Sequence, residues 1–539
     1  MTSRLCRREM TSHTMLLAVA TFWVACANAA FFSRVVAAFP PQGTTLLAIA
    51  SLAVSLIAVT ALLLAPFTLG RAAKPILTVL LPVAAVCAYF MDSFGVAING
   101  DMLRNAAETQ WDEALDLVTP KLLAYIVFLG LGPATLLWLL PLKWLGWRKE
   151  ILHRLVLVAV LSAITGLSIT AAGDFFASFL REHKALRAYA NPAAPLVAAV
   201  RYGKAGLAGA ADTTTVQPIA SDSHLTANDA GRELILLVVG ETARVDRLSI
   251  NGYARDTTPH LRQEKVLSFT NFWACGSSTA VSVPCMFSAL GMEKFDPQVA
   301  LQQENLLDIA QRAGVNVLWL DNNSSSKGVA LRVPYVDYRT PKNNPRCDDE
   351  CRDVGMLASL QDYIDSRPKG DILIVLHQMG NHGPAYYRRY PPEFEKFRPA
   401  CHDKDLSRCS SEEIGNAYDN AILYTDHFLG QVIELLKRND SSFDTALFYV
   451  SDHGESLGER GIYLHGLPRV IAPDSQFHVP AILWFGQSNR DVDVPALAKK
   501  LQQRFTHDNL FHTILGLLEI ETTIYRKELD MLDGAHLPE

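Results

Sequence analysis

The stretch Thr445-Ala-Leu-Phe-Tyr-Val-Ser-Asp452-His453-Gly454-Glu455 joins an apolar run to an Asp-His pair at a glycine turn. The run predicts a buried strand, so the Asp-His pair is expected at the edge of a sheet. A second apolar run, 233–239, ends in the same way in Gly240-Glu241-Thr242. Carboxylate and imidazole groups that converge from strand ends suit zinc. We therefore expect the functional site where these two strands end.

Apolar runs of β type alternate with helical patterns over the C-terminal two thirds of the chain. The expected strands are 234–239, 315–320, 372–376 and 446–450, and the expected helices are 304–313, 353–365 and 412–437. This alternation predicts an α/β domain with a mostly parallel sheet flanked by helices. Ligands of such sheets gather at the carboxyl ends of the strands. Those ends carry polar groups, namely Glu241, Asp321-Asn322-Asn323, His377 and Asp452-His453.

The first third of the chain is far more apolar than the rest. It holds five apolar runs of about 20 residues, the length that a membrane-spanning helix requires. The runs are 15–36, 45–67, 75–98, 121–142 and 155–176, and no comparable run follows. We expect an all-α transmembrane domain with five helices over 1–180, a connector with an amphipathic helix over 181–230, and a catalytic domain over 231–539.

Lysine and arginine bias predicts the orientation of these spans. The N-terminal tail and the second and fourth connections are basic and are expected in the cytoplasm. The third connection, 99–120, is acidic and is expected outside, and an odd number of spans places the C-terminal two thirds outside too. A cleaved signal peptide ending near Ala27-Asn28-Ala29 is an alternative that leaves the catalytic domain outside as well.

Cysteine usage agrees with an oxidising compartment. Six of the nine cysteines form three local couples in the exported region: Cys275/Cys285, Cys347/Cys351 and Cys401/Cys409. An even count predicts disulfides, although only proximity favours these pairings, and buried thiols are the alternative. The formal net charge of −6 gives no basic surface for nucleic acid.

The segment Cys275-Gly-Ser-Ser-Thr279-Ala-Val-Ser-Val-Pro-Cys285 places hydroxyls where a helix would begin. Serine and threonine are common helix N-caps, which is the simpler interpretation. A helix N-terminus also accepts a phosphoryl group. Zinc coordination would favour the alkoxide of a threonine, which is otherwise a poor nucleophile. The spacing alone leaves both interpretations open.

Several motifs occur together and in order along the chain. They are Gly240-Glu241-Thr242-Ala-Arg244, Cys275-Gly-x-x-Thr279-x-x-Ser282-x-Pro284-Cys285, Asn381-His382-Gly383-Pro384-x-Tyr386, Ser451-Asp452-His453-Gly454-Glu455 and Tyr463-Leu464-His465-Gly466. This set resembles the lipid A phosphoethanolamine transferases, a family that includes the colistin-resistance enzymes. The resemblance covers nearly the whole chain. It implies a multi-pass protein of the bacterial inner membrane, with a periplasmic catalytic domain of alkaline-phosphatase/sulfatase type.

The resemblance also implies roles for individual residues. The residues that match the family's zinc ligands are Glu241, Thr279, Asp452 and His453, with Thr279 also the nucleophile that becomes phosphorylated. The residues that match its catalytic histidines, at the substrate phosphate or a second zinc, are His382 and His465. The residues that match its substrate-binding groups are Lys327, Asn323, Asn105, Thr109 and Glu113, the last three in a lipid-facing loop. One zinc ion is implied and a second is left open.

The resemblance implies transfer of phosphoethanolamine from phosphatidylethanolamine to a lipid A phosphate through a phosphothreonine-type intermediate. Such transfer, by a membrane-bound monomer, would lower the negative surface charge and give polymyxin and colistin resistance. The alternative is the same donor chemistry with an acceptor in the lipopolysaccharide core sugar or another envelope glycan.

Two other classes fit less well. A sulfatase has Cys or Ser followed by x-Pro-x-Arg, and Thr279-Ala-Val-Ser-Val lacks that pattern. Transfer of the group to water, as a sulfatase or phosphatase performs it, is therefore expected only as a side reaction. A membrane metal sensor without catalysis would leave the threonine nucleophile and the five spans unexplained.

Overall fold

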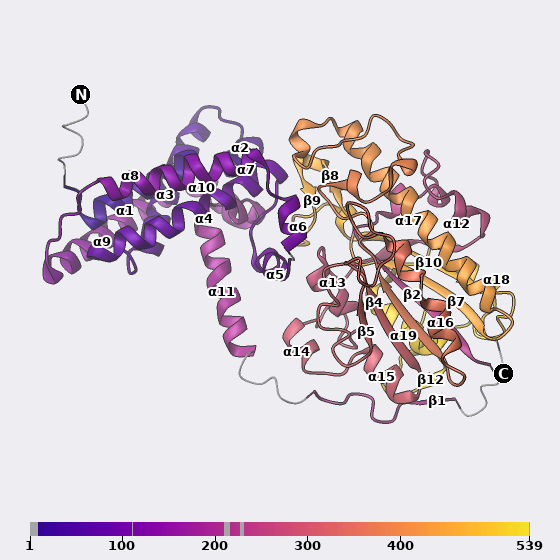
Figure 1. Cartoon of the computed structure of the whole chain (residues 1–539). Coiled ribbons are helices and arrows are strands. Elements are labelled where there is room, and N and C mark those ends of the chain that lie inside the picture. The colour runs from indigo at the N-terminus through magenta and orange to yellow at the C-terminus, as the bar shows by residue number, and fades with distance from the viewer. Residues whose placement is uncertain (1–8, 110, 210–215, 227–230, 538–539) are drawn as a thin grey trace. The chain divides into compact units, whose positions relative to one another are not determined.

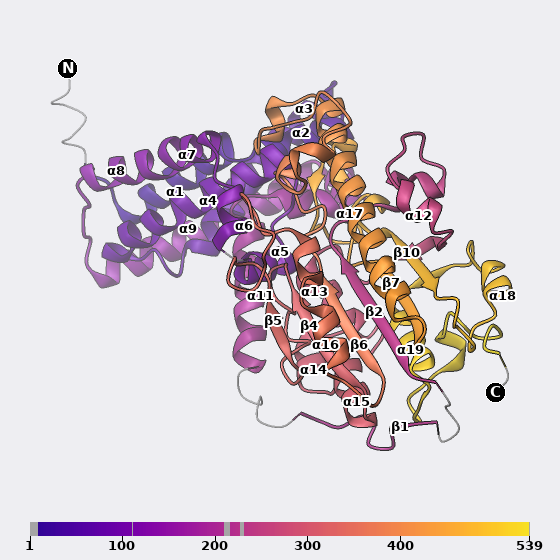
Figure 2. The ribbon, with the colours of Figure 1, turned by 45° about the vertical axis from the view of Figure 1, so that its right-hand side comes forward.

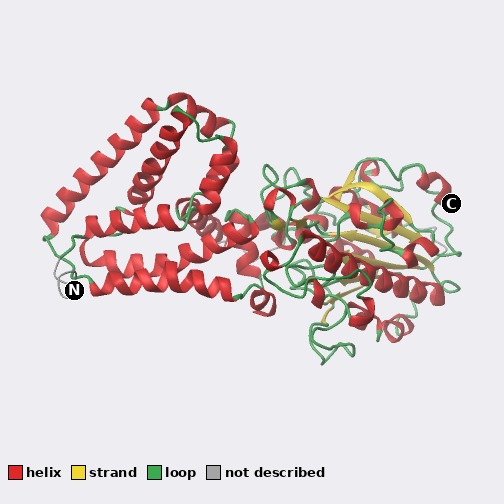
Figure 3. Cartoon of the chain, turned by 90° about the horizontal axis from the view of Figure 1, so that it is seen from above, coloured by secondary structure: helices red, strands yellow, loops and turns green. Residues whose placement is uncertain are grey.

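The computed structural model describes residues 9–109, 111–209, 216–226 and 231–537 (Figure 1). The chain forms two compact units. The helical unit comprises residues 1–103 and 118–205, and the α/β unit comprises residues 104–117 and 206–539. The segment 104–117, which lies between two spans in the sequence, therefore groups with the α/β unit. Among the described residues, strands occur only in the α/β unit (Figure 3).

The helical unit has the apolar helices that the sequence predicts. Four segments are long and apolar enough to cross a membrane: Thr44–Leu64, Gly70–Phe94, Pro120–Leu139 and Trp147–Ala171. The first predicted span is instead two helices, α1 (Ser12–Cys26) and α2 (Ala29–Ala38), bent by 59° at a short break. The described residues thus hold four spans, or five if the bent pair counts as one.

The elements of the helical unit, and those of the segment that leaves it, have the following bounds. They are α3 (Thr44–Leu64), η2 (Gly70–Ala72), α4 (Ala73–Phe94), α5 (Gly100–Glu108), α6 (Trp111–Asp116), α7 (Pro120–Tyr125), η3 (Ile126–Leu131), α8 (Gly132–Leu139), α9 (Trp147–Ala171), α10 (Gly173–Arg181), η4 (Lys184–Tyr189) and α11 (Ala193–Gly209). The amphipathic helix expected in the connector is thus a set of shorter elements, α10, η4 and α11.

Buried hydrogen bonds stabilise the break between α1 and α2. Asn28 lies at the break and donates from Nδ2 to the carbonyl oxygens of Trp23, at 2.9 Å, and Asn191, at 2.7 Å. Its Oδ1 accepts the N–H of Asn191 at 2.9 Å. Asp92 on α4 accepts the N–H of Ala30 at 2.7 Å, in the first turn of α2. Backbone groups freed by the bend are therefore satisfied, as an apolar surrounding requires.

The α/β unit is built on an eight-stranded sheet of order β11-β3-β10-β7-β2-β6-β4-β5. Strands β7, β2, β6, β4 and β5 are parallel, whereas β10 runs antiparallel to both of its neighbours. Figure 2 shows β4, β6, β2 and β7 side by side. The bounds are β2 (Glu233–Gly240), β3 (Leu267–Trp273), β4 (Asn316–Asp321), β5 (Tyr335–Asp337), β6 (Ile372–His377), β7 (Asp444–Ser451), β10 (His478–Phe485) and β11 (Phe505–Thr506).

The four predicted strands are confirmed as β2, β4, β6 and β7. Every residue of β2, β6 and β7 is buried, which is why these strands are continuous apolar runs rather than alternating ones. Strands β3 and β10 were not predicted, and they extend the sheet beyond its parallel part. Two small two-stranded sheets pair β1 (His224–Leu225) with β12 (Ile520–Glu521) and β8 (Ser456–Leu457) with β9 (Tyr463–Leu464).

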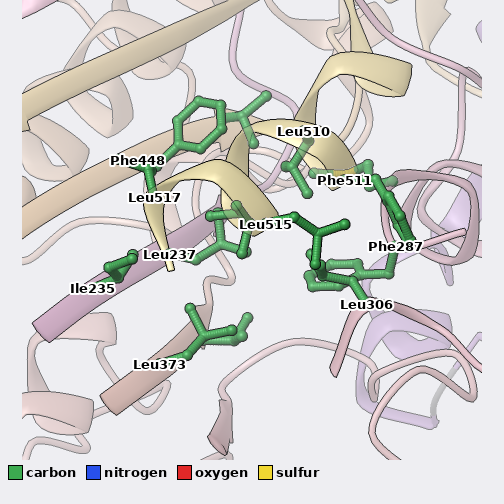
Figure 4. Close-up of a cluster of buried hydrophobic side chains, with 14 of the residues drawn as sticks. Ile235, Leu237, Phe287, Leu306, Leu373, Phe448, Leu510, Phe511, Leu515 and Leu517 are labelled. Carbon is green, nitrogen blue, oxygen red and sulfur yellow. The ribbon is translucent and has the colours of Figure 1, made fainter. Parts of the chain in front are cut away.

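Helices pack on the sheet. The α-helices of this unit are α12 (Pro259–Gln263), α13 (Thr279–Met286), α14 (Pro297–Leu301), α15 (Leu306–Ala313), α16 (Leu360–Asp365), α17 (Ser411–Asn439), α18 (Val494–Ala498) and α19 (His507–Leu517). One core cluster joins Ile235, Leu237 and Phe448 of the strands to Leu510 and Leu515 of α19 (Figure 4). Because β2 and β7 are fixed in this core, the groups at their carboxyl ends are fixed as well.

Three disulfides are formed, Cys275–Cys285, Cys347–Cys351 and Cys401–Cys409. The pairings favoured by proximity in the sequence are therefore confirmed. The first of them joins Cys275, four residues before α13, to Cys285 in the last turn of α13, the helix that begins at Thr279.

Replacement of Asn28 tests the bend in the first span. We expect Asn28→Ala to lower the free energy of unfolding of the full-length protein by about 1–3 kcal/mol, because it removes the hydrogen bonds that Asn28 makes to the buried backbone N–H and carbonyl of Asn191. The measurement is thermal or denaturant unfolding in detergent. Thr21→Ala is the matched control, since the exposed Thr21 donates only to Leu17 in its own helix. An equal effect of the two substitutions would contradict this role of Asn28.

Candidate active site

Two strand ends bring three metal-binding side chains together. Glu241 follows β2, and Asp452 and His453 follow the neighbouring β7. All three side chains are fully buried, and one ligand atom from each lies within 4.8 Å of the other two. His453 Nε2 is 3.4 Å from Glu241 Oε1 and 3.4 Å from Asp452 Oδ2. The sequence placed these groups at one sheet edge, and the structure brings them to one point.

Thr279 reaches the same point from the start of α13. Its hydroxyl donates to Glu241 Oε2 at 3.1 Å and lies 3.4 Å from His453 Nε2. The N-cap position of the helix is occupied by Ser278, whose side chain makes no capping hydrogen bond. The simpler interpretation of Thr279 as an N-cap is therefore wrong, because its hydroxyl faces the acidic cluster.

Burial of two carboxyl groups in one cluster is electrostatically unfavourable. Burial, together with the charge of Asp452, raises the pKa of Glu241 to about 8. Burial also raises the pKa of Asp452 to about 7. Glu241 Oε1 and Asp452 Oδ2 have no hydrogen-bond partner among the described residues. Buried acceptors of this kind need a cation or a donor. Three oxygen ligands and one imidazole fit a tetrahedral zinc site.

Neighbouring groups orient the cluster. Asp452 Oδ1 accepts the N–H of His453 at 2.7 Å. His453 Nδ1 is 2.9 Å from the carbonyl oxygen of Gly454, which directs Nε2 toward the carboxylates, as in many metal sites. Asn323 donates from Nδ2 to Glu241 Oε2 at 2.7 Å. Asn323 thus contacts a member of the cluster directly.

The imidazole rings of His382 and His465 lie next to each other beside the cluster. The His465 ring centroid lies 4.3 Å from that of His453 and 5.4 Å from that of His382. Burial lowers the pKa of His465 to about 4. Burial, with the charge of His465 as the next cause, lowers the pKa of His382 well below its ordinary value. Both imidazoles are therefore neutral at neutral pH and able to accept a proton or bind a metal.

The other predicted substrate-binding residues with described side chains, Lys327, Asn105 and Thr109, have no hydrogen bond to the acidic cluster among the described residues. Lys327 Nζ donates to the carbonyl oxygens of Ser324, at 3.0 Å, and Glu108, at 3.3 Å. Thr109 donates from its hydroxyl to the carbonyl oxygen of Asn105 at 2.6 Å. Among the described residues, no hydrogen bond joins the side chain of Asn105 or Thr109 to the cluster. The side chain of Glu113 lies outside the described residues. The roles of these three residues stay predictions.

Comparisons with known proteins agree with this geometry. A family model described as "Phosphoethanolamine transferase EptA/EptB" matches residues 56–207, and one described as "Sulfatase" matches residues 233–520. Phosphatidylethanolamine transferase Mcr-1 of Escherichia coli is 39% identical over 95% of this chain and 96% of its own length. Phosphoethanolamine transferase EptA of E. coli K12 is 38% identical over 99% and 98%. The chain belongs to the EptA/Mcr family of phosphoethanolamine transferases.

A solved structure supports the same assignment for both units of this transferase. The integral membrane lipooligosaccharide phosphoethanolamine transferase A from Neisseria meningitidis superimposes with a TM-score of 0.94 at 34% identity, covering 98% of this chain and 100% of that one. The chain is thus a multi-pass membrane protein whose C-terminal part is a sulfatase-like periplasmic domain. The expected family, fold class and localisation are confirmed.

The site of the transferase contains groups to which the sequence analysis gave no role. Glu455 is fully buried, and its carboxylate lies 3.4 Å from His465 Nδ1. Burial raises the pKa of Glu455 to about 8. His377, at the end of β6, places Nδ1 3.0 Å from Asp321 Oδ2. Both residues lie at strand ends that the sequence predicts, because Glu455 follows the Asp-His-Gly turn and His377 ends a strand. The sequence does not show that Glu455 lies beside His465, or that His377 lies beside Asp321.

The pH dependence of stability without metal tests the acidic cluster. In the folded state the pKa of Glu241 is raised from 4.5 to about 8, and that of Asp452 from 3.8 to about 7. Protonation of these two groups therefore stabilises the folded state fully below their ordinary pKa values. This stabilisation is lost as the pH rises through about 7 and then about 8. Metal binding requires the ionised forms and strengthens over the same range. We therefore expect the difference in melting temperature between metal-loaded and chelator-treated protein to grow from about pH 6.5 to about pH 8.5.

Two variants make this measurement specific. Asp452→Asn should remove most of the pH-dependent difference, since it removes a titrating ligand. Asp256→Asn is the matched control, because Asp256 is exposed and pairs with Arg262 at the surface. A difference that is flat with pH in the wild type, or lost equally in both variants, would contradict the assignment.

Proposed function

We propose that this enzyme transfers phosphoethanolamine from phosphatidylethanolamine to a lipid A phosphate through a covalent intermediate on Thr279. The observation that carries the proposal is the placement of the Thr279 hydroxyl among Glu241, Asp452 and His453. The names of the relatives support the donor, and the name of the N. meningitidis structure supports an acceptor in lipooligosaccharide.

In the first half-reaction, Thr279 Oγ1 attacks the phosphorus of phosphatidylethanolamine. The bond that forms joins Oγ1 to phosphorus, and the bond that breaks joins phosphorus to the diacylglycerol oxygen. Glu241 accepts the hydrogen bond of the Thr279 hydroxyl and orients it. The proton that Thr279 loses passes to the diacylglycerol oxygen, with His382 or His465 as its carrier. Diacylglycerol leaves, and phosphoethanolamine stays on Thr279.

In the second half-reaction, a lipid A phosphate oxygen attacks the same phosphorus and releases Thr279. His382 and His465 are neutral because burial lowers their pKa values, and the neutral imidazole is the form that can accept a proton from the incoming group. The carboxyl group of Glu455 lies 3.4 Å from His465 Nδ1 and would orient that imidazole toward the reacting phosphate. Lys327 would offset charge on the transferring oxygens, and electrostatic stabilisation of this kind is the main contribution of a protein to phosphoryl transfer. Asn323 holds Glu241 in place through the hydrogen bond from its Nδ2.

Glu241, Thr279, Asp452 and His453 would hold one zinc ion, which when bound supplies the positive charge that favours ionisation of the threonine hydroxyl. The unpartnered acceptors Glu241 Oε1 and Asp452 Oδ2 support this assignment. His382 and His465 would hold a second zinc if one is present. We infer that the enzyme acts as a monomer and that the added amine lowers the negative charge of the cell surface, giving polymyxin and colistin resistance.

A second acceptor class has support from more distant relatives. Kdo(2)-lipid A phosphoethanolamine 7''-transferase of E. coli is 27% identical over 81% of this chain, and its name places the transferred group on a sugar unit. The donor chemistry would be unchanged with such an acceptor. We place the lipid A phosphate first because the relatives at 38–39% identity include EptA and Mcr-1 rather than the 7''-transferase.

Replacement of the nucleophile tests the proposed function in cells. We expect Thr279→Ala to lower the phosphoethanolamine content of lipid A by at least about a thousandfold, because removal of a nucleophile leaves only binding and electrostatic contributions. The measurement is mass spectrometry of lipid A from cells that express each protein. Thr279→Ser is the matched control and should retain part of the activity. If the wild-type enzyme modifies the core sugar and not lipid A, the alternative acceptor is correct. Near-normal transfer by Thr279→Ala would exclude the covalent intermediate on Thr279.

The lipid-facing loop gives a separate prediction. We expect Asn105→Ala and Glu113→Ala to lower lipid A modification about tenfold or more while the bound metal is retained, because a lipid that is poorly positioned loses much of the advantage of an intramolecular reaction. Metal analysis of the purified variants, with cleavage of a small soluble phosphoethanolamine ester, distinguishes positioning from chemistry. Equal losses of ester cleavage and lipid transfer would show that the loop acts on the site itself.

A further inference from the structure

The helical unit contains an apolar groove that the proposed reaction does not use. The groove encloses about 720 Å³. We call it the α3–α11 groove, because its walls come from α3 (Leu52, Leu56, Val59), α10 (Phe176, Phe179) and α11 (Val197). All of its lining residues belong to the helical unit.

The charged lining residues of the groove are all basic. Lys184, Arg187 and Arg201 line it, and all three side chains are exposed. The structure shows no ion pair and no side-chain hydrogen bond for any of the three with another described residue. No lining residue of the groove is an aspartate or a glutamate. Three cations without a carboxylate partner among the described residues give a mostly apolar groove a net positive charge, which favours an anionic occupant.

The basic lining residues lie on the periplasmic side of the membrane. Lys184, Arg187 and Arg201 follow the last span, α9, which ends at Ala171. Asn99 and Gly100, which line the same groove, follow α4, whose end faces the same side because an even number of spans separates the two points. The apolar walls run from there along α3 and α9, which are spanning helices. An occupant would therefore have a headgroup at the periplasmic surface and acyl chains in the outer leaflet.

We propose that the α3–α11 groove binds one glycerophospholipid with a net negative headgroup, of the phosphatidylglycerol type. The three cations pair with its phosphate. A zwitterionic phosphatidylethanolamine is disfavoured, because its ammonium group would lie beside three cations with no carboxylate among the lining residues. Lipid A is disfavoured because a single groove accommodates only part of its set of acyl chains. The bound lipid would hold α10, η4 and α11 against the spanning helix α3.

Photocrosslinking of the full-length protein in nanodiscs tests this site. The probe is phosphatidylglycerol with a photoactivatable acyl chain, and the crosslinked peptides are mapped by mass spectrometry. We expect labelling within residues 173–201 that the same probe built on phosphatidylethanolamine gives at least tenfold more weakly. The triple variant Lys184→Gln, Arg187→Gln, Arg201→Gln should lose labelling by on the order of a hundredfold, since each cation near a lipid surface contributes about fivefold to affinity for an anionic lipid.

Two further variants keep the test decisive. Arg71→Gln, Arg148→Gln, Lys149→Gln removes three exposed cations of the helical unit that lie outside the groove, and it should leave labelling of 173–201 unchanged. Ala194→Phe fills the groove without a change of charge and should abolish labelling at an unaltered melting temperature. Equal labelling by the two phospholipids, preferred labelling by a lipid A probe, or labelling that survives both groove variants would overturn the proposal.

Discussion

The site depends on two carboxyl groups that are buried side by side without a basic partner. Glu241 and Asp452 end adjacent parallel strands, and burial raises the pKa of both groups. Such an arrangement is stable only where the carboxyl groups are protonated or a cation offsets their charge. The positions of Thr279, His453 and Asn323 all follow from that requirement, because each one contacts Glu241 or the space between the two carboxyl groups.

The rest of the α/β unit holds these groups in place. Strands β2 and β7 are buried along their full length, so the residues after them cannot move without disturbing the core. The Cys275–Cys285 disulfide ties the loop before α13 to the last turn of that helix and so restrains Thr279 where the strands end. Catalysis of phosphoryl transfer depends mainly on positioning and on charge stabilisation. The rigid strand ends and the restrained start of α13 hold the charged groups and Thr279 in position.

The sequence predicted the parallel part of the sheet because buried parallel strands are continuous apolar runs, as in 234–239 and 446–450. It did not predict β10, because Pro480 interrupts that run and proline disfavours a strand interior. The structure accommodates Pro480 where the register between β10 and β3 shifts. The bend after Cys26 was also missed, since Asn28 is one polar residue in an apolar run. Its hydrogen bond to Asn191 is made across 163 positions of sequence, which no local pattern reports. The motifs placed Thr279, Asp452 and His453 correctly in one cluster, whereas pairings such as Glu455 with His465 needed the fold.

The central claim is that Thr279 carries the transferred group, and direct detection of the intermediate tests it most directly. The full-length enzyme is incubated with phosphatidylethanolamine in the absence of acceptor, quenched in acid and digested, and the peptide that contains Thr279 is sequenced by mass spectrometry. The account predicts one added phosphoethanolamine group on Thr279, which disappears when lipid A is supplied before the quench. Release of diacylglycerol and transfer to lipid A with no adduct on the enzyme, or with an adduct on another residue, would contradict it.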